Sequence, residues 1–489
     1  MHGTWLFGYV FRPLVFLLAF AVAEPHTGAW FDSYAVSLWP TAAADDDGDD
    51  GGGGRGGRGG RGGRSSDGGD GMRQGRGFSN AARSFNPLGI FRKKRTKSRR
   101  TARQQARPAV VVTRAENELI VFGFTPEERD ALTAQGFSVI DETPIEIVGG
   151  SLAKLQVPAG VSLEEARTRV LQASPAAVVD FNNFYRPEQA ADADCDSSRC
   201  LQRVMIDWPV ITGPENGCTG QPRIGMIDTA INPKHDAFEG SNMETIRLAA
   251  DGLPQSGRQH GTAVAALLVG RSDGRTPGLL PNAQLIAVDA FRDAGRAGDR
   301  AEAYDLIRAL DLLAKRDVSV INLSLAGPGN LLLERTVTLL TDRGVTLVAA
   351  VGNDGPRAEP LYPAAYAPVV AVTAIDRSKR PYRRAVRGDH VDLAAPGVSV
   401  WTAASVKGAR AKSGTSFAAP FVAAAAAILK AANPQMPSSE IAEMLARTAE
   451  DLGEPGKDAV FGWGLLNAAG LCASTATVGL DGAAATAVD

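Results

Sequence analysis

The sequence of 489 residues carries a formal net charge of −2 at pH 7. This length exceeds that of a usual single domain, so we expect two or three regions. The near-neutral balance excludes a chain that binds nucleic acid through its overall charge. The charges are nevertheless segregated, because residues 45–50 are acidic and residues 92–107 are densely basic with no acid.

Residues 1–23 have the pattern of a secretory signal peptide. Arg12 precedes an apolar run over residues 14–23, which ends in Ala-Val-Ala, a small-x-small cleavage pattern. We therefore expect an exported protein, located in the periplasm, outside the cell or at the cell envelope. The alternative is an uncleaved membrane anchor, since extending the run back to Trp5 reaches spanning length but places Arg12 within it.

Residues 24–108 are predicted to be disordered. Residues 51–64 are rich in glycine, with arginines at a period of three, a composition that cannot bury enough apolar surface to offset chain entropy. Behind a signal peptide, this pattern favours a flexible, solvated tether. Arg-Gly-Gly repeats in a cytosolic or nuclear protein would instead indicate RNA binding. Polyanion binding through this basic region is the alternative, although nucleic acid is not the expected partner.

Residues 109–187 are expected to form a small α+β domain. Two capping boxes, Thr125 with Glu128 and Ser162 with Glu165, mark the starts of its helices. The predicted elements are a strand at 119–122, a helix to 135, strands at 137–140 and 151–157, a helix to about 173 and a strand at 178–181. This β-α-β-β-α-β order predicts a ferredoxin-like fold. Residues 188–198 are small, acidic and polar, which predicts an exposed segment within a linker at 188–205.

A larger domain is predicted over residues 206–473, followed by a tail at 474–489. Strands and helices alternate along it, which indicates a parallel sheet with helices on both faces. The predicted strands are 284–288, 318–325, 345–352 and 368–373, and the predicted helices are about 300–315, 332–342 and 440–448.

Four polar residues in this domain stand at the ends of strands or the starts of helices. Asp228 and Asn353 follow apolar strands, His260 opens a helix of small residues, and Ser416 precedes an alanine-rich helix. Taken singly, each has a structural explanation, such as a helix cap or a turn. Taken together, they are the groups that acyl transfer needs.

At these residues the chain resembles the subtilisin-like serine proteases, the subtilase family. The order Asp…His…Ser is the order found in subtilisin. Three further segments, 321–328, 391–397 and 461–468, resemble family landmarks. The resemblance implies a doubly wound α/β fold in which Ser416 is the nucleophile, His260 the general base and Asp228 its orienting carboxylate. It implies that Asn353 donates to the oxyanion.

The resemblance also implies how a substrate binds. Ser324, Leu325 and Ala326 would form a strand edge that pairs with a peptide. Leu361 would form the floor of the specificity pocket. Leu361 and Ala326 add volume, so we expect a shallow pocket for small or modest apolar side chains. Ala263 and Ala230 depart from the family pattern without removing a catalytic group.

By position and topology, the 109–187 unit resembles a subtilase propeptide. The resemblance implies that it inhibits the site intramolecularly until a cut is made in the linker. The alternative is an independent binding domain that stays attached to the chain.

The four cysteines, Cys195, Cys200, Cys218 and Cys472, lie in or beside the catalytic domain. In an exported protein an even count indicates disulfides, and four cysteines allow three connectivities. We predict the pairs Cys195–Cys200 and Cys218–Cys472. Four free thiols are the alternative if the protein is not exported.

The sequence thus predicts an exported serine endopeptidase that acts on proteins or peptides. No small-molecule cofactor is expected. No Asp-rich spacing indicates a metal site, and calcium is not predicted because the segment before Gln284, where some family members carry a calcium loop, is short. A catalytically inactive, peptide-binding relative is the other alternative.

Overall fold

The computed structural model describes residues 112–187, 201–209, 221–248 and 252–472. The predictions for the signal peptide, the Arg/Gly-rich region and the tail fall outside these residues. So do most of the 188–205 linker and three of the four cysteines.

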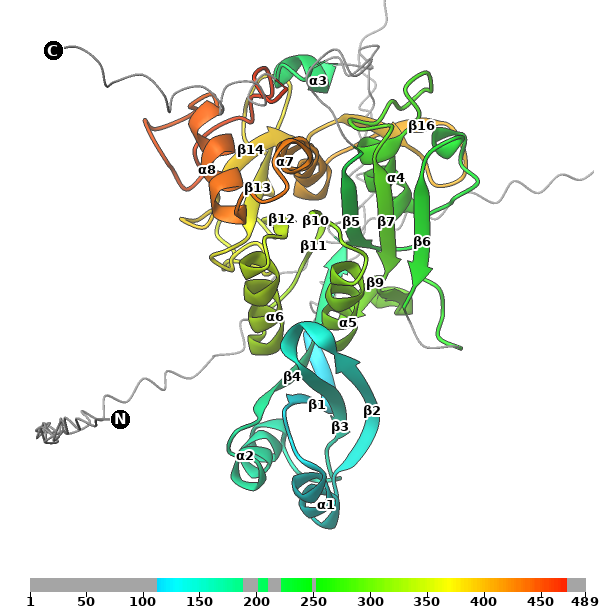
Figure 1. Ribbon diagram of the computed structural model, residues 1–489, viewed down its shortest axis with the longest axis vertical. Helices are drawn as coiled ribbons and strands as arrows, with labels where there is room; N and C mark the ends of the chain where they lie inside the picture. Colours follow the sequence, from blue (N-terminus) through cyan, green and yellow to red (C-terminus); the bar gives the residue numbers. More distant parts are fainter. Residues whose placement is uncertain (1–111, 188–200, 210–220, 249–251, 473–489) are drawn as a thin grey trace, which may run out of the picture. The chain divides into compact units, whose positions relative to one another are not determined.

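Residues 114–187 form an antiparallel sheet with two helices (Figure 1). The strand order is β2-β3-β1-β4, and the β-α-β-β-α-β order of elements is the predicted one. That the unit belongs to the ferredoxin-like architecture stays a prediction. The elements are β1 (Arg114–Phe122), α1 (Pro126–Ala134), β2 (Ser138–Ile145), β3 (Gly150–Gln156), α2 (Leu163–Ala173) and β4 (Val178–Pro187).

Of the two predicted capping boxes, the first forms completely. Thr125 and Glu128 each accept a hydrogen bond from the other residue's backbone amide. At the second, Ser162 caps the Glu165 amide, but the reciprocal bond is absent because the Glu165 carboxylate pairs with Arg169 one turn later. The prediction of a second complete capping box was therefore wrong.

The larger domain is built on a parallel sheet, as predicted, and this sheet has seven strands. Its strand order is β14-β13-β12-β10-β5-β7-β6, and every neighbouring pair in it is parallel. The strands are β5 (Arg223–Asp228), β6 (Met243–Arg247), β7 (Gln284–Asp289), β10 (Val320–Leu323), β12 (Thr346–Ala350), β13 (Val370–Ile375) and β14 (Leu393–Pro396).

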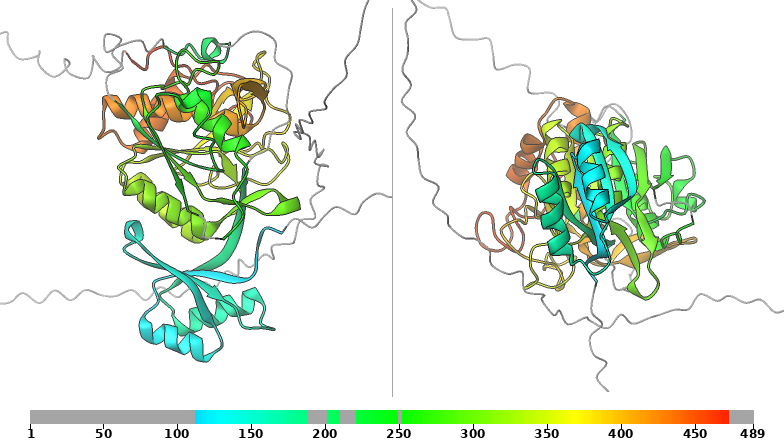
Figure 2. Two further views of the ribbon diagram at one scale, coloured as in Figure 1. Left: turned by 90° about the vertical axis from the view of Figure 1, so that its right-hand side faces the viewer. Right: turned by 90° about the horizontal axis from the view of Figure 1, so that it is seen from below.

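Helices cover both faces of this sheet (Figures 1 and 2). One layer holds α4 (Gln259–Val269) and α7 (Ala419–Ala432), with α8 (Ser438–Thr448) beside α7. The other layer holds α5 (Ala303–Ala314) and α6 (Leu331–Asp342). Because the sheet is covered on both sides, its central strands β10, β12 and β13 are buried along their whole length, whereas the edge strand β6 is partly exposed.

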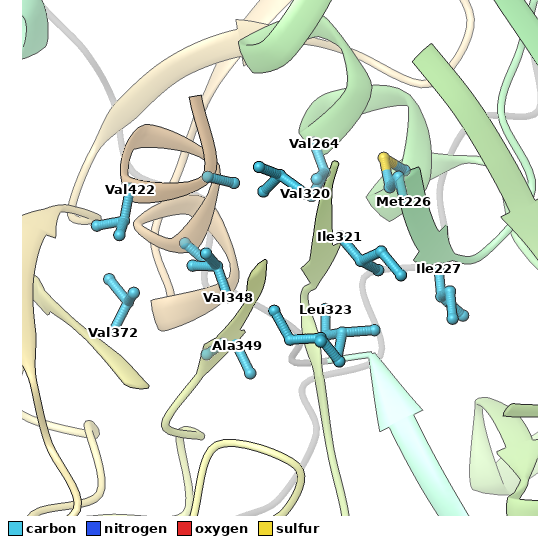
Figure 3. Close-up of a cluster of buried hydrophobic side chains, with 14 of the residues drawn as sticks. Met226, Ile227, Val264, Val320, Ile321, Leu323, Val348, Ala349, Val372 and Val422 are labelled. Atoms are coloured by element: carbon cyan, nitrogen blue, oxygen red, sulfur yellow. The ribbon is translucent and has the colours of Figure 1, made fainter. Parts of the chain in front are cut away.

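The core lies between the sheet and these helices. Side chains from β5, β10, β12 and β13 meet Val264 of α4 and Val422 of α7 (Figure 3). The alanines at 423–427 are all fully buried. Such small side chains allow α7 to lie close to the strands. The stretch Thr415–Ala432 is long and apolar enough to cross a membrane by length and composition, and 89% of it is buried inside the fold.

Several boundaries differ from the prediction. Residues 300–302, expected in the helix at about 300–315, belong instead to strand β9 (Asp299–Glu302), and α5 begins at Ala303. β12 ends at Ala350 because Gly352 has a φ of 100°, which breaks extended geometry. The strand predicted at 318–325 is divided into β10 and β11 (Leu325–Ala326). Short elements that were not predicted include α3 (Leu201–Met205), β8 (Phe291–Asp293), β15 (Val400–Ala403) and β16 (Ala409–Lys412).

The most consequential difference is the length of β4. The prediction ended this strand at Phe181, whereas it continues to Pro187. Its last residues leave the small sheet and pair with two strands of the large domain, β9 and β11.

Candidate active site

The four predicted catalytic residues come from four elements of the parallel sheet and its helices. Asp228 is the last residue of β5, and Asn353 follows the end of β12. His260 is the second residue of α4. Ser416 lies in the 3₁₀ turn Thr415–Phe417, directly before α7. Parallel strands end at one edge of the sheet, where the helices that pack on it begin.

Asp228 and His260 form a buried hydrogen-bonded pair. His260 Nδ1 lies 2.7 Å from Asp228 Oδ1, and the carboxylate is 1% exposed. A carboxylate only accepts, so Nδ1 carries the proton and Nε2 is the basic nitrogen of the neutral ring. Nε2 is buried and has no hydrogen-bond partner among the described residues. The imidazole centroid lies 5.4 Å from that of Phe417, next to Ser416.

A glycine fixes the start of α4 against the loop after β5. The Gly261 amide donates to Thr229 Oγ1 over 3.0 Å. A Cβ at Gly261 would lie 2.2 Å from the Thr229 carbonyl oxygen, so no other residue fits without moving the backbone. The His-Gly dipeptide is thus required for His260 to reach Asp228.

Ser416 is tied to the proposed substrate-binding strand. Its Oγ donates to the Ser324 carbonyl oxygen over 3.2 Å. In return, Ser324 Oγ donates to the Ser416 carbonyl oxygen over 2.8 Å, and it accepts from Asn322 Nδ2. These bonds hold the turn of Ser416 against the end of β10.

Asn353 has a fixed acceptor and an available donor. Its Oδ1 accepts from the Thr415 amide and hydroxyl over 3.1 and 3.2 Å. Its Nδ2 is buried and has no partner among the described residues. A buried amide donor without an acceptor is costly. Asn353 keeps such a donor next to Ser416, because its Oδ1 is bonded to Thr415, the residue before Ser416.

The chain's own strand β4 occupies the edges of β11 and β9. Pro187 and Arg186 pair with Leu325 and Ala326 of β11. On the other side, Phe184 and Tyr185 pair with Glu302 and Ala301 of β9. Both pairings are antiparallel, so the end of β4 forms the middle strand of a three-stranded arrangement beside Ser324.

Tyr185 fills the space behind β11. Its ring is fully buried, and its hydroxyl donates to the Pro328 carbonyl oxygen over 2.8 Å. A Cβ at Gly327 would lie 2.5 Å from the ring, so this glycine makes the space. Leu361 lies beside Gly352, near the Asn353 turn, and its role as a pocket floor stays a prediction.

The described residues contain two other histidines, His235 and His390. His235 is buried, and its Nδ1 accepts from the Ala237 amide at the start of a 3₁₀ turn. Burial lowers the pKa of His390, despite the opposing charge of Asp392. Neither is hydrogen-bonded to one of the four candidates in the described part of the chain.

Two further predictions concern metal binding and disulfide bonds. The described residues hold no group of three or more His, Cys, Asp or Glu side chains that could bind a metal ion. Cys472 is bonded in a disulfide. Cys195, Cys200 and Cys218 lie outside the described residues, so the connectivity stays a prediction.

Comparison with known proteins gives consistent relatives. The model of the Subtilase family (Peptidase_S8) matches residues 220–464. Subtilisin BL from Lederbergia lenta is 34% identical over 260 residues, 52% of this chain and 91% of that protein. Subtilisin DY from Bacillus licheniformis is 31% identical over 251 residues, 50% and 88% of the two chains. Minor extracellular protease Epr from Bacillus subtilis (strain 168) is 32% identical, over 51% of this chain and only 38% of its own length.

A solved structure supports the fold independently of sequence. Fervidolysin from Fervidobacterium pennivorans superposes with a TM-score of 0.62, covering 74% of this chain and 61% of its own. At 19% identity this likeness supports the fold alone.

One buried acid beside the site was not singled out from the sequence. Asp289 ends β7 and is the register partner of Asp228 on the neighbouring strand. Burial raises its pKa to about 6, against the opposing effect of hydrogen bonds from Ser256 and the Phe291 amide, and the Asp228 charge adds to the rise. Asp289 ends an apolar strand as Asp228 does, but it stands in none of the segments that resemble the family, so no signal identified it.

The pKa of Asp289 predicts a pH dependence of stability. A carboxyl whose folded-state pKa exceeds its ordinary value of 3.8 binds its proton more tightly in the folded protein. Its contribution to stability therefore increases as the pH falls from about 7 to about 4. In a Ser416→Ala background, Asp289→Asn should raise the free energy of unfolding at pH 8 by at most about 3 kcal/mol, and by little at pH 4.

Urea unfolding at the two pH values measures this effect. Asp376→Asn is the control with the opposite sign: burial opposes the shift, but hydrogen bonds from Arg380 and Ser378 lower the pKa of Asp376 overall. Equal stability changes for Asp289→Asn at pH 8 and pH 4 would contradict the prediction.

Proposed function

Because the chain belongs to the subtilase family of serine endopeptidases, we propose that it cleaves peptide bonds with Ser416 as nucleophile and His260 as general base. Asp228 orients His260. The observation that carries this proposal is the 2.7 Å hydrogen bond between His260 Nδ1 and Asp228 Oδ1. It leaves Nε2 as the basic nitrogen beside the turn that holds Ser416.

The proposed reaction has two halves. His260 Nε2 takes the Ser416 proton as Oγ bonds to the substrate carbonyl carbon, and the carbonyl oxygen becomes an oxyanion. The same proton then passes to the departing amine, which leaves an acyl-enzyme. Water then attacks the acyl carbon with His260 again as general base, Ser416 Oγ leaves with the proton, and the acid product is released. Asn353 Nδ2 and the Ser416 amide are the proposed oxyanion donors.

The first test is to compare wild type with Ser416→Ala. Wild type should react with a fluorophosphonate at Ser416 and lose the region before about residue 200, whereas the variant should do neither. Intact mass, N-terminal sequencing and labelling of the purified proteins give the answer. A wild type that stays full length and unlabelled would instead support the inactive, peptide-binding alternative.

Asn353→Ala tests the oxyanion donor. It should lower kcat by about 10²–10³-fold, the loss known for the equivalent donor in subtilisin, with little change in KM. Steady-state kinetics on a peptide substrate measure both constants. Asn353→Asp is the matched variant, because it keeps the Oδ1 acceptor for Thr415 but replaces the donor. A rise in KM with kcat unchanged would argue against this role.

We also propose that residues 112–187 act as an intramolecular inhibitor. The support is the pairing of β4 with β11, the strand edge proposed to bind a substrate, and with β9. Polar contacts reinforce it, since Lys154 and Asn182 donate to Glu302 over 2.6 and 2.8 Å. Burial raises the pKa of Glu302, but Lys154, Asn182 and Arg292 together bring it below its ordinary value.

Apolar and helix-end contacts add to this interface. Ile147 is buried within the large core, and its amide donates to Asp311 of α5 over 2.9 Å. Asp180 accepts from the Leu331 amide at the start of α6 over 2.7 Å, where the helix dipole favours a carboxylate. A cut in the linker alone therefore does not release the unit, because these contacts must also break.

Tyr185→Ala tests the inhibitor proposal. Peptide hydrolysis by the processed protein is titrated with fragment 109–187, after circular dichroism has established that the fragment folds. The wild-type fragment should inhibit, and Tyr185→Ala should weaken inhibition by about 30-fold or more, as expected for a buried aromatic anchor. Tyr185→Phe keeps the ring and should cost about tenfold for the lost hydroxyl bond. Equal inhibition by all three fragments would contradict the proposal.

Export is part of the proposal. It is supported by the pattern of residues 1–23 and by the disulfide at Cys472, because disulfides persist in oxidising compartments. Protein or peptide substrates are the proposed partners. The cut that separates the inhibitor is expected beyond Pro187, within the linker.

A further inference from the structure

Two residues beside the proposed triad, Ser256 and Asp289, are buried and have no role in the reaction described above. Asp289 ends β7 directly beside Asp228, which ends β5. Ser256 lies in the loop four residues before His260. Their positions bring both residues against the segments that carry the catalytic acid and base.

A chain of hydrogen bonds runs through these residues. The Ala230 amide donates to Ser256 Oγ over 2.8 Å, and Ser256 Oγ donates to Asp289 Oδ1 over 2.8 Å. The Phe291 amide donates to the same carboxylate oxygen over 3.2 Å. One hydroxyl thus uses its proton and a lone pair to connect the loop after Asp228, the loop before His260 and the end of β7.

The neighbouring bonds show why this connection matters. Gly261 and Asn232 donate their amides to Thr229 Oγ1 and Thr262 Oγ1, and so fasten α4 to the loop after β5. These bonds act after His260 in the sequence. Ser256 supplies a corresponding hydrogen bond before His260 in the sequence. Without its hydroxyl, the buried Ala230 amide would lose its acceptor.

We propose that Ser256 and Asp289 act as one unit that positions His260 against Asp228 for proton transfer. This inference rests on the proposed function. Asp289 fixes the rotamer of Ser256, and Ser256 sets the separation between the two loops. A shift of one loop would lengthen the 2.7 Å bond between His260 and Asp228, and small misplacements of catalytic groups cost up to about 10²-fold in rate.

The charged groups around Asp289 come from several elements. Asp228 on β5 and Arg247 on β6 act on it electrostatically. Asp299 on β9 accepts from the Gly257 amide, next to Ser256, and interacts with Asp228 and His260. Removing the Asp289 charge should therefore move the acid limb of kcat/KM to lower pH, because a nearby negative charge favours the imidazolium.

The experiment is a double-mutant cycle on the processed protein. Ser256→Ala, Asp289→Ala and the double variant are compared by kcat, KM and the rate of fluorophosphonate labelling of Ser416. Each single variant should lose about tenfold or more in kcat and in labelling rate, with KM within about twofold. The double variant should lose no more than either single variant, because one chain is broken in all three.

Conservative variants separate positioning from folding. Ser256→Thr keeps the hydroxyl and Asp289→Asn keeps the acceptor, so both should retain most of kcat, while Asp289→Asn shifts the acid limb to lower pH. Asp305→Asn is the matched control: its pKa is also raised to about 6, chiefly by burial, and its carboxylate bonds Arg308. It should leave kcat and the acid limb unchanged.

The outcomes are distinguishable. A wild type that fails to label would defeat the proposed function. A labelled wild type with Ser256→Ala reacting at the same rate would overturn the positioning unit alone, as would additive losses in the double variant. Loss of kcat in Ser256→Thr and Asp289→Asn equal to that of the alanine variants would likewise overturn it.

Discussion

The hydrogen bond between Asp228 and His260 is the contact on which the rest of the site depends. It joins residues that are 32 positions apart, on a strand end and a helix start. Its length is set by the backbone fit at Gly261 and by the hydrogen bonds that the Thr229 and Ser256 hydroxyls accept from the Gly261 and Ala230 amides. A short, buried acceptor–donor pair cannot adapt to a shifted helix, so the surrounding loops are held at several points.

Burial of charge limits how such a site can be built. The carboxylates of Asp228 and Asp289 end adjacent parallel strands, and each has one oxygen without a hydrogen-bond partner among the described residues. Removing a carboxylate from water is costly unless it is bonded. Two such groups side by side cost more still, which is consistent with the raised pKa of Asp289. Stability at this edge of the sheet is thus reduced where the groups for chemistry are gathered.

The parallel sheet and the positions of the four candidate residues could be predicted because each residue type stands next to a strongly patterned strand or helix. The strands at the contact between the two domains, β9 and the end of β4, could not be predicted. Residues 299–302, Asp-Arg-Ala-Glu, and the Asn-Asn pair within β4 have low strand propensity. Their extended form comes from strand pairing: residues 299–302 pair with β8 and with Phe184 and Tyr185 of β4, and Asn183 pairs with Arg114 of β1. Ser256 and Asp289 were missed for a related reason, since their connection exists only across 33 positions of folded chain.

The course of β4 has a consequence for the timing of activation. The end of β4 and the proposed nucleophile belong to one chain. The effective concentration of one at the other is therefore set by the fold and does not depend on the protein concentration. Under the proposed function, the first cut would follow first-order kinetics. Once the linker is severed, the same contacts obey mass action, and dilution favours separation. Under the proposed function, the processed protein would stay inhibited at high concentration and become active on dilution.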